Sequence, residues 1–337
     1  MGWLKDLITK IRGVPPTDWT LVESLQDPGL GIAGKAVLPD QCYVELFVES
    51  LRLEKARRFA TTFHGVVYCF ASLARTGTNR AELASVTKPQ KLAAMQAGDL
   101  GRVITVSKRV MGTMPWRGDP LGLELGLFAV KSGNLLTPLI EYVTKISNKA
   151  GISVVTQLDP FLPLITEGLD MIAGQTADTE IELAIDTDMS LSESRLCALV
   201  ALPKGKIDSA KLSIDKADRK LLQNGKPLNA AYCVFSIRHN GRNPDWGTIP
   251  ALQQAYADFN RAILSGKRKE AEEALSGFNR QLIVCPDLIT ADKDRLKTKV
   301  RADLHDAFPG GGQSAKEDVQ KRFKERVLSD LNLYNDE

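Results

Sequence analysis

The sequence predicts an α+β protein: a mainly antiparallel β-sheet or β-sandwich packed by helices, followed by a helical C-terminal extension. Three observations lead to this fold class. Runs typical of strands occupy two blocks between residues 42 and 237. Two apolar helical patterns, at about residues 134–149 and 160–173, separate the blocks. After Pro250 the pattern is helical, and strands that do not alternate regularly with helices argue against a doubly wound sheet.

Length and composition favour more than one structural unit. The chain has 337 residues, of which 43% are hydrophobic and 25% charged, with a net charge of +3. It is therefore longer than the ~250–300 residues that one core usually supports. We divide it into an N-terminal amphipathic helix at residues 1–16, an α+β core at residues 17–248 and a helical region at residues 249–337.

The N-terminal segment has one apolar face. A helix over residues 2–12 would place five large apolar side chains at spacings of three and four, and the Gly-Val-Pro-Pro run at residues 13–16 would end it. Such a short helix does not persist alone in water. We expect its face to dock on the protein's own core, on a partner or on a membrane surface. The face consists of Trp3, Leu4, Leu7, Ile8 and Ile11.

The first block of strands contains the clearest strand signal. Four leucines alternate with glycine, acidic or aromatic residues from Leu121 to Phe128, which places all four on one face of a strand. In the run from Val44 to Leu53 the alternation changes parity near Glu49 and Ser50, which predicts a β-bulge or a twist of face. The block predicts strands at residues 44–53, 59–73, 102–110 and 121–127, with a long loop at residues 74–99.

The same patterns predict the elements of the second block and of the C-terminal region. Apolar runs predict strands at residues 180–185, 196–202 and 232–237. The dipeptides Asn224-Gly225 and Asn240-Gly241 indicate turns. Apolar residues at spacings of three and four predict helices at residues 250–264, 268–284, 291–307 and 315–333.

The sequence contains no motif that assigns a chemistry. It has three histidines and no Gly-rich phosphate loop or metal-spaced Cys/His cluster, so we expect no cofactor and no resident metal. The five cysteines form no CxxC pair, and we interpret them as buried, reduced thiols of a cytoplasmic protein. They are Cys42, Cys69, Cys197, Cys233 and Cys285.

Two weaker sequence patterns leave cysteine hydrolysis and cation binding as possible functions. His64-Gly65 resembles the His-Gly pair of caspase-like proteases, and the resemblance implies a cysteine nucleophile, for which Cys197 and Cys233 are the candidates. Both cysteines lie inside apolar runs and not at the end of a strand. Asp186 and Asp188 end a predicted strand, where carboxylates can bind a cation or form a solvated turn.

Two loops carry the residue types that dominate protein interfaces. Tryptophan and arginine are enriched at binding hot spots, and both occur in residues 114–119 and again in residues 238–246. The predicted binding residues are Trp116, Arg117, Arg238, His239, Arg242 and Trp246.

The predicted function is that of a non-catalytic interaction protein of the cytoplasm: an adaptor, a scaffold or a complex subunit. Its partner is expected to be another protein or a second copy of the chain, with no small-molecule ligand. The small net charge gives no reason to expect nucleic acid. The alternatives are a peripheral membrane protein that acts through residues 1–16 and a caspase-like cysteine hydrolase.

Overall fold

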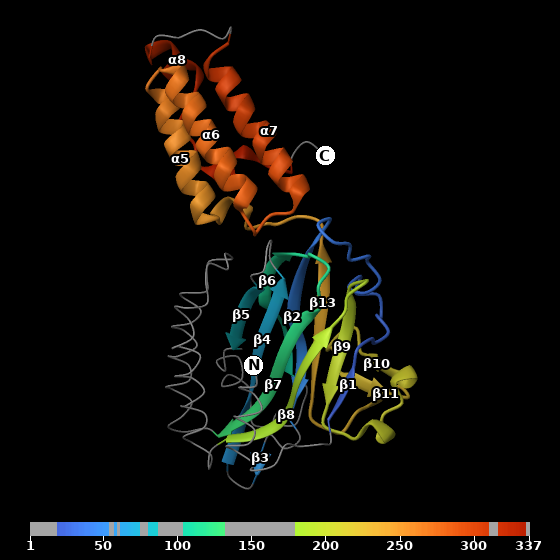
Figure 1. Cartoon of the computed structure of the whole chain (residues 1–337). Helices are drawn as coiled ribbons and strands as arrows, with labels where there is room; N and C mark the ends of the chain where they lie inside the picture. The colour runs from blue at the N-terminus through green and yellow to red at the C-terminus, as the bar shows by residue number, and fades with distance from the viewer. Residues whose placement is uncertain are drawn as a thin grey trace.

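The computed structural model consists of a strand unit and a helical unit that meet at one end of the strands (Figure 1). We call the described residues up to 245 the strand unit and the described residues from 246 onward the helical unit. The predicted helices at residues 1–16, 134–149 and 160–173 lie outside the described residues. The structure describes residues 19–53, 57–58, 61–74, 80–86, 104–131, 179–309 and 316–334.

The first sheet has five antiparallel strands: β1 (Thr20–Val22), β2 (Tyr43–Arg52), β6 (Ile104–Pro115), β9 (Arg195–Val200) and β13 (Tyr232–Asn240). Their order is β1-β9-β13-β2-β6. The two blocks of strands in the sequence therefore do not form separate sheets, because β9 and β13 of the second block pair with strands of the first. Both are nearly continuous apolar runs, as expected of strands that are covered on both faces.

The second sheet also has five antiparallel strands: β3 (Arg57–Arg58), β4 (Thr61–Ala74), β5 (Arg80–Val86), β7 (Leu121–Lys131) and β8 (Thr179–Met189). The order is β3-β4-β7-β8, and β5 also pairs with β4. The predicted loop at residues 74–99 is therefore wrong over β5. This segment has little β-branched or aromatic character, and its strand depends on main-chain pairing with β4.

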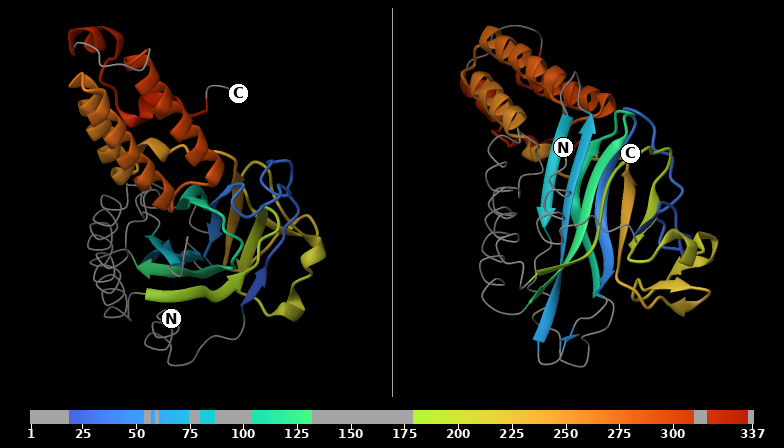
Figure 2. Two further views of the ribbon diagram at one scale, coloured as in Figure 1. Left: turned by 45° about the horizontal axis from the view of Figure 1, so that its top comes forward. Right: turned by 60° about the horizontal axis from the view of Figure 1, so that its bottom comes forward.

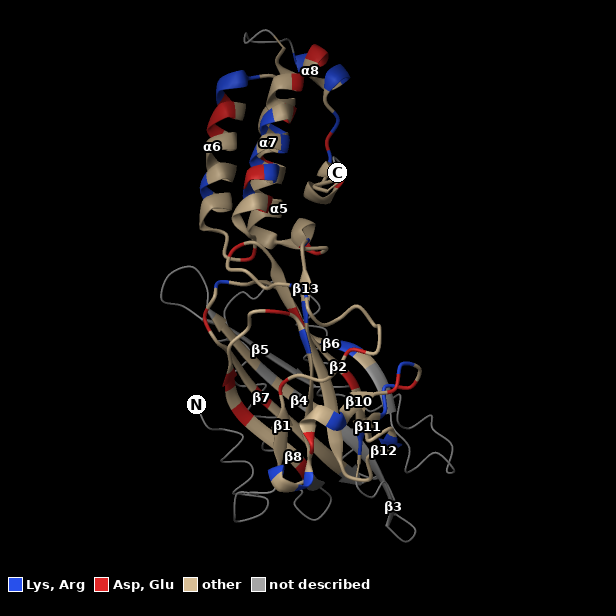
Figure 3. Cartoon of the chain, turned by 90° about the vertical axis from the view of Figure 1, so that its right-hand side faces the viewer, with Lys and Arg blue, Asp and Glu red and all other residues tan. Residues whose placement is uncertain are grey.

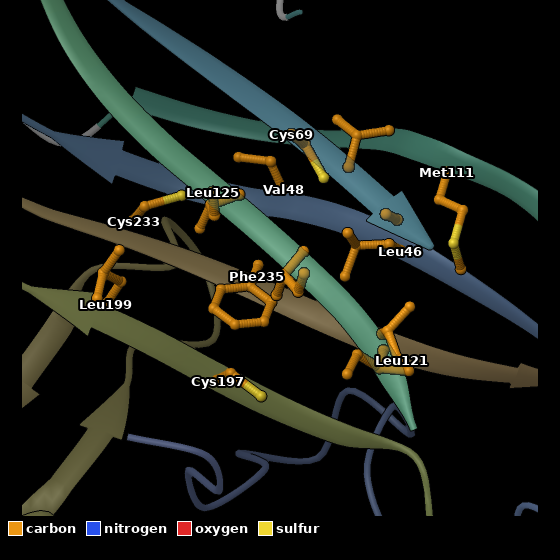
Figure 4. Close-up of a cluster of buried hydrophobic side chains, with 14 of the residues drawn as sticks. Leu46, Val48, Cys69, Met111, Leu121, Leu125, Cys197, Leu199, Cys233 and Phe235 are labelled. Atoms are coloured by element: carbon orange, nitrogen blue, oxygen red, sulfur yellow. The ribbon is translucent and has the colours of Figure 1, made fainter. Parts of the chain in front are cut away.

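Side chains of both sheets share one hydrophobic core (Figure 4). The strand predicted from the alternating leucines is confirmed, because the four leucines from Leu121 to Leu127 are at most 1% exposed and all belong to this core. Phe235 of β13 and Leu46 of β2 reach the same core from the first sheet. The packing of these side chains holds the two sheets together.

The parity change near Glu49 and Ser50, for which the sequence predicts a β-bulge or a twist of face, is a β-bulge in the structure. Val234 of β13 pairs with Ser50, and the next residue, Phe235, pairs with Val48, so Glu49 is an extra residue in β2. A bulge changes the face to which the following side chains point, which accounts for the change of parity in the sequence.

A small three-stranded sheet covers the other face of the first sheet. Its apolar side chains, such as Leu212 and Leu221, pack with Val200 and Val234 in a second hydrophobic cluster. Asn224 and Gly225 have φ angles of 54° and 73°, as the predicted two-residue hairpin turn requires. The elements of this region are η2 (Lys204–Lys206), η3 (Ser209–Lys211), β10 (Leu212–Ile214), β11 (Leu221–Gln223) and β12 (Lys226–Pro227).

The helical unit has its own hydrophobic core and lies beyond one end of the sheets (Figure 2). The first three predicted helices are confirmed within one residue of their bounds, and Pro250 occupies the first helical position, where a missing N–H breaks no bond. The elements are η4 (Trp246–Thr248), α5 (Pro250–Leu264), α6 (Arg268–Val284), α7 (Thr290–Ala307), α8 (Lys316–Arg322) and η5 (Leu328–Leu331).

The helix predicted at residues 315–333 is wrong beyond Arg322, where α8 ends. Contacts with distant residues hold the following segment in another conformation. The Asn260 side-chain amide donates a hydrogen bond to the main-chain oxygen of Arg326 at 2.9 Å, and the Arg326 guanidinium binds Asp303. The segment then buries Leu328 in the core of the helical unit.

Candidate binding sites at the junction and on the helical unit

Arg117 connects the loop after β6 to the loop between α6 and α7. Its guanidinium forms an ion pair with Asp40 and donates hydrogen bonds to the main-chain oxygens of Leu288 at 3.0 Å and Pro286 at 3.4 Å. Asp40 in turn accepts a hydrogen bond from the Thr290 hydroxyl at the start of α7. Because the guanidinium presents several donors in a fixed plane, Arg117 fastens the helical unit to the strand unit.

Asp292 of α7 is the centre of a buried network beside this loop. Its carboxylate accepts hydrogen bonds from the Tyr43 hydroxyl at 2.6 Å and the Tyr334 hydroxyl at 2.7 Å, and Arg295 binds it at 2.8 Å. Burial raises the pKa of Tyr43, and the charge of Asp292 raises it further, so the hydroxyl stays a hydrogen-bond donor at neutral pH. The network joins β2, α7 and the C-terminal segment.

The two predicted binding tryptophans are internal. Trp116 is 1% exposed and belongs to the core of the strand unit, whereas Trp246 is 6% exposed and belongs to the core of the helical unit. Rings of this size contribute mainly by burying apolar surface. In this structure neither ring is presented at the surface.

Arg238 is bound to a buried carboxylate within the strand unit. Its guanidinium lies 2.6 Å from Glu49 Oε1 and 3.8 Å from the centroid of the Phe47 ring. The Ser236 hydroxyl donates to the same oxygen at 2.5 Å, and Arg219 lies 3.7 Å from the other oxygen. Because Glu49 is 0% exposed, its charge needs these partners. The extra residue of the bulge, Glu49, is thus the residue that binds Arg238.

His239 and Arg242 lie at or near the surface. Burial lowers the pKa of His239, and the nearby charge of Lys35 lowers it further, so the ring is neutral at pH 7. The Arg242 guanidinium lies 5.3 Å from the centroid of the Tyr334 ring and remains exposed. A binding role for these two residues stays a prediction.

Of the five cysteines, the candidate nucleophiles Cys197 and Cys233 lack the features of an activated thiol. All five are free and buried. Burial raises the pKa of Cys197, and it raises the pKa of Cys233 to about 12. Because the thiolate is the reactive form, neither thiol is activated at neutral pH. The main chain of His64 lies in β4, opposite Val130 of β7.

We expect all five thiols to resist alkylation while the protein is folded. Burial limits access to all five thiols. The raised pKa values of four of them also disfavour the thiolate, so iodoacetamide should leave the intact mass unchanged until a denaturant is added. These four are Cys42, Cys69, Cys197 and Cys233. The variants Cys197→Ala and Cys233→Ala should keep the biological activity. One thiol that reacts rapidly in the native protein would instead favour the cysteine hydrolase.

Asp186 and Asp188 are exposed on β8. In the strand register they lie opposite Glu124 and Gly122 of β7. Within the described ranges, no group of three or more His, Cys, Asp or Glu side chains could hold a metal ion. Cation binding by the two aspartates therefore gains no support from neighbouring ligands.

A groove between α6 and α7 is the site that the sequence did not reveal. It has a volume of about 630 Å³ and combines apolar side chains with basic ones. The basic residues of α7 recur every four positions, but the same spacing is found on ordinary solvated helices. Only the packing of α6 against α7 shows that the basic stripe borders a groove. Its lining residues are Arg268, Glu272, Leu275, Ser276, Asn279, Lys297, Arg301, Leu304, His305 and Phe308.

The junction and the groove differ in how far their charges are paired. At the junction, Arg117 and Asp292 bind residues of the chain itself. In the groove, neither Lys297 nor Arg301 forms an ion pair with another residue that the structure describes. Comparisons with models of protein families, with curated proteins and with solved structures find no match to this chain.

Proposed function

We propose that the protein is a non-catalytic interaction protein, an adaptor, scaffold or complex subunit, whose helical unit presents a groove to another protein. This proposal rests on the groove between α6 and α7. Leu275, Leu304 and Phe308 give it apolar lining, while Lys297 and Arg301 border it as exposed cations. An apolar centre with a polar, charged rim is the usual composition of a protein interface.

The attachment of the helical unit supports the same proposal. Arg117 holds two main-chain oxygens of the α6–α7 loop, and Tyr43 binds Asp292 of α7. The groove is thereby fixed in orientation relative to the strand unit. A surface that is already ordered loses less conformational entropy on binding, which suits a docking face.

The two alternative functions have less support. The raised pKa values of Cys197 and Cys233 disfavour a cysteine hydrolase. A peripheral membrane protein would depend on Trp3, Leu4, Leu7, Ile8 and Ile11, which lie outside the described residues. No helix in the described part of the chain combines the length and the apolar character that crossing a bilayer requires.

Two finer assignments belong to the proposal. We assign the two five-stranded sheets to a β-sandwich, because both contribute side chains to one core. We assign the protein to the cytoplasm, because its five cysteines are free and free thiols are typical of reducing compartments.

A photo-cross-linking experiment in the native host tests the proposed function. A photoreactive amino acid at Ser276, which is exposed and lines the groove, should give a discrete covalent adduct with one partner protein. Mass spectrometry of the adduct identifies the partner. The same amino acid at Gln281 serves as the control, because Gln281 is exposed on α6 and is not part of the groove.

The adduct at Ser276 should disappear when Arg301→Glu is added, because the change reverses one of the charges on the rim. Equal adducts from Ser276 and Gln281, or none from either position, would count against a binding role for the groove.

A further inference from the structure

The groove has a row of basic residues along one side. Lys297, Arg301 and His305 follow one another at spacings of four, so they lie on one stripe of α7. Figure 3 shows basic positions recurring along α7. The lining contains one carboxylate, Glu272, and Arg268 already pairs with it at 2.7 Å. The lining therefore has an excess of positive charge, which complements carboxylates on a partner.

An exposed apolar residue extends the groove toward the junction. Ile283 is 71% exposed and lies four residues after Asn279, so both are on the same side of α6. Lys293 Nζ donates a hydrogen bond to the main-chain oxygen of Ile283 at 2.9 Å, which places the first turn of α7 beside it. Exposed apolar surface at Ile283 thus lies on the side of α6 that borders the groove, as does the partly exposed Leu275 of the lining.

One polar group in the groove lacks a hydrogen bond. The side-chain oxygen of Asn279 is buried and accepts none from the residues that the structure describes. A buried acceptor without a donor is destabilising.

From these observations we propose that the groove binds an acidic amphipathic helix of a partner protein. This inference rests on the proposed function and adds the chemistry of the partner. The valley between two packed helices accepts a further helix. The partly exposed Leu275 and Leu304 and the exposed Ile283 match the apolar face of an amphipathic helix. Glutamate or aspartate beside that face would meet Lys297 and Arg301.

A nucleic acid is the other polyanion that a basic groove could bind. Single-stranded nucleic acids bind through bases stacked on exposed aromatic rings. The lining contains two rings: Phe308 is 2% exposed and belongs to the core of the helical unit, and His305 contributes a single exposed imidazole. The exposed apolar side chain of Ile283 also has no counterpart in a sugar-phosphate backbone. The partner is therefore a protein.

Selection from a displayed peptide library tests the proposal on the full chain. Peptides of about 15 residues match the groove, because α6 rises about 1.5 Å per residue from Arg268 to Ile283. Selected binders should share apolar residues at spacings of three and four, flanked by glutamate or aspartate. The double variant Lys297→Glu/Arg301→Glu should bind them about tenfold less tightly or worse.

The double variant Arg322→Glu/Lys324→Glu is the matched control, because it changes the net charge equally at exposed positions outside the groove. It should keep the full affinity. Binders without acidic residues, equal weakening by both double variants, or no enrichment would overturn the proposal. So would an oligonucleotide that displaces the selected peptides. If the Ser276 adduct persists while the selection fails, the function stands and only the partner's chemistry is wrong.

Discussion

Replacing Leu125 with alanine is expected to lower the free energy of unfolding by ~2–5 kcal/mol. Leu125 is 0% exposed and lies between Cys69 and Ile185 in the register of the second sheet. Its side chain points into the core that both sheets share (Figure 4). The shorter side chain would leave a cavity that rigid strands on both sides cannot fill.

Equilibrium unfolding in urea, followed by circular dichroism, measures the effect. Leu38→Ala is the matched control, since Leu38 is 48% exposed and its truncation should change stability by less than about 0.5 kcal/mol. A similarly small loss for Leu125→Ala would contradict the assignment of Leu125 to the core.

The second large effect is expected at Arg238. Replacing it with alanine leaves the buried Glu49 carboxylate with Ser236 and with Arg219 at 3.7 Å. Breaking a buried ion pair from one side is strongly destabilising. Because two partners remain, we expect a loss of about 3 kcal/mol, the lower end of the range for such pairs. Arg261→Ala removes an exposed ion pair on α5 and should have little effect.

A double-mutant cycle separates the free energy of the ion pair from the other effects of replacing Arg238. In a Glu49→Gln background the buried charge is already absent, so Arg238→Ala should cost clearly less than in the wild type. Equal costs in both backgrounds would mean that the charge of Glu49 is not what Arg238 stabilises. An unchanged stability of Arg238→Ala would return this residue to the set of candidate binding residues.

The parts of the fold that the sequence predicted are those with strong local patterns. The alternation from Leu121 to Leu127 indicates one buried face, and the parity change near Glu49 indicates a bulge or a twist of face whatever the neighbouring strands are. The bounds of α5 and α6 follow from Pro250 and from helical spacing. Each of these signals depends on residues that are close together in the chain, so the sequence alone is sufficient to predict the element.

The incorrect predictions concern segments whose conformation depends on contacts with residues far away in the sequence. The strand β5 depends on pairing with β4, and the conformation after Arg322 depends on Asn260 and Asp303. The same holds for the sites. Trp116 and Arg238 were predicted from composition as binding residues, yet their positions in the fold are set by partners far away in the chain. The groove exists only because α6 and α7 pack together.

The helical unit is also a closed loop of chain. The main-chain N–H of Asn243, at its entrance, donates a hydrogen bond to the hydroxyl of Tyr334, 91 positions later, at 2.8 Å. Closing a flexible loop of that length costs about 4 kcal/mol in entropy, far more than one hydrogen bond returns. The helices must therefore pack first and bring the ends together. Tyr334 thus closes the loop at a point to which the packed helices have already brought its hydroxyl.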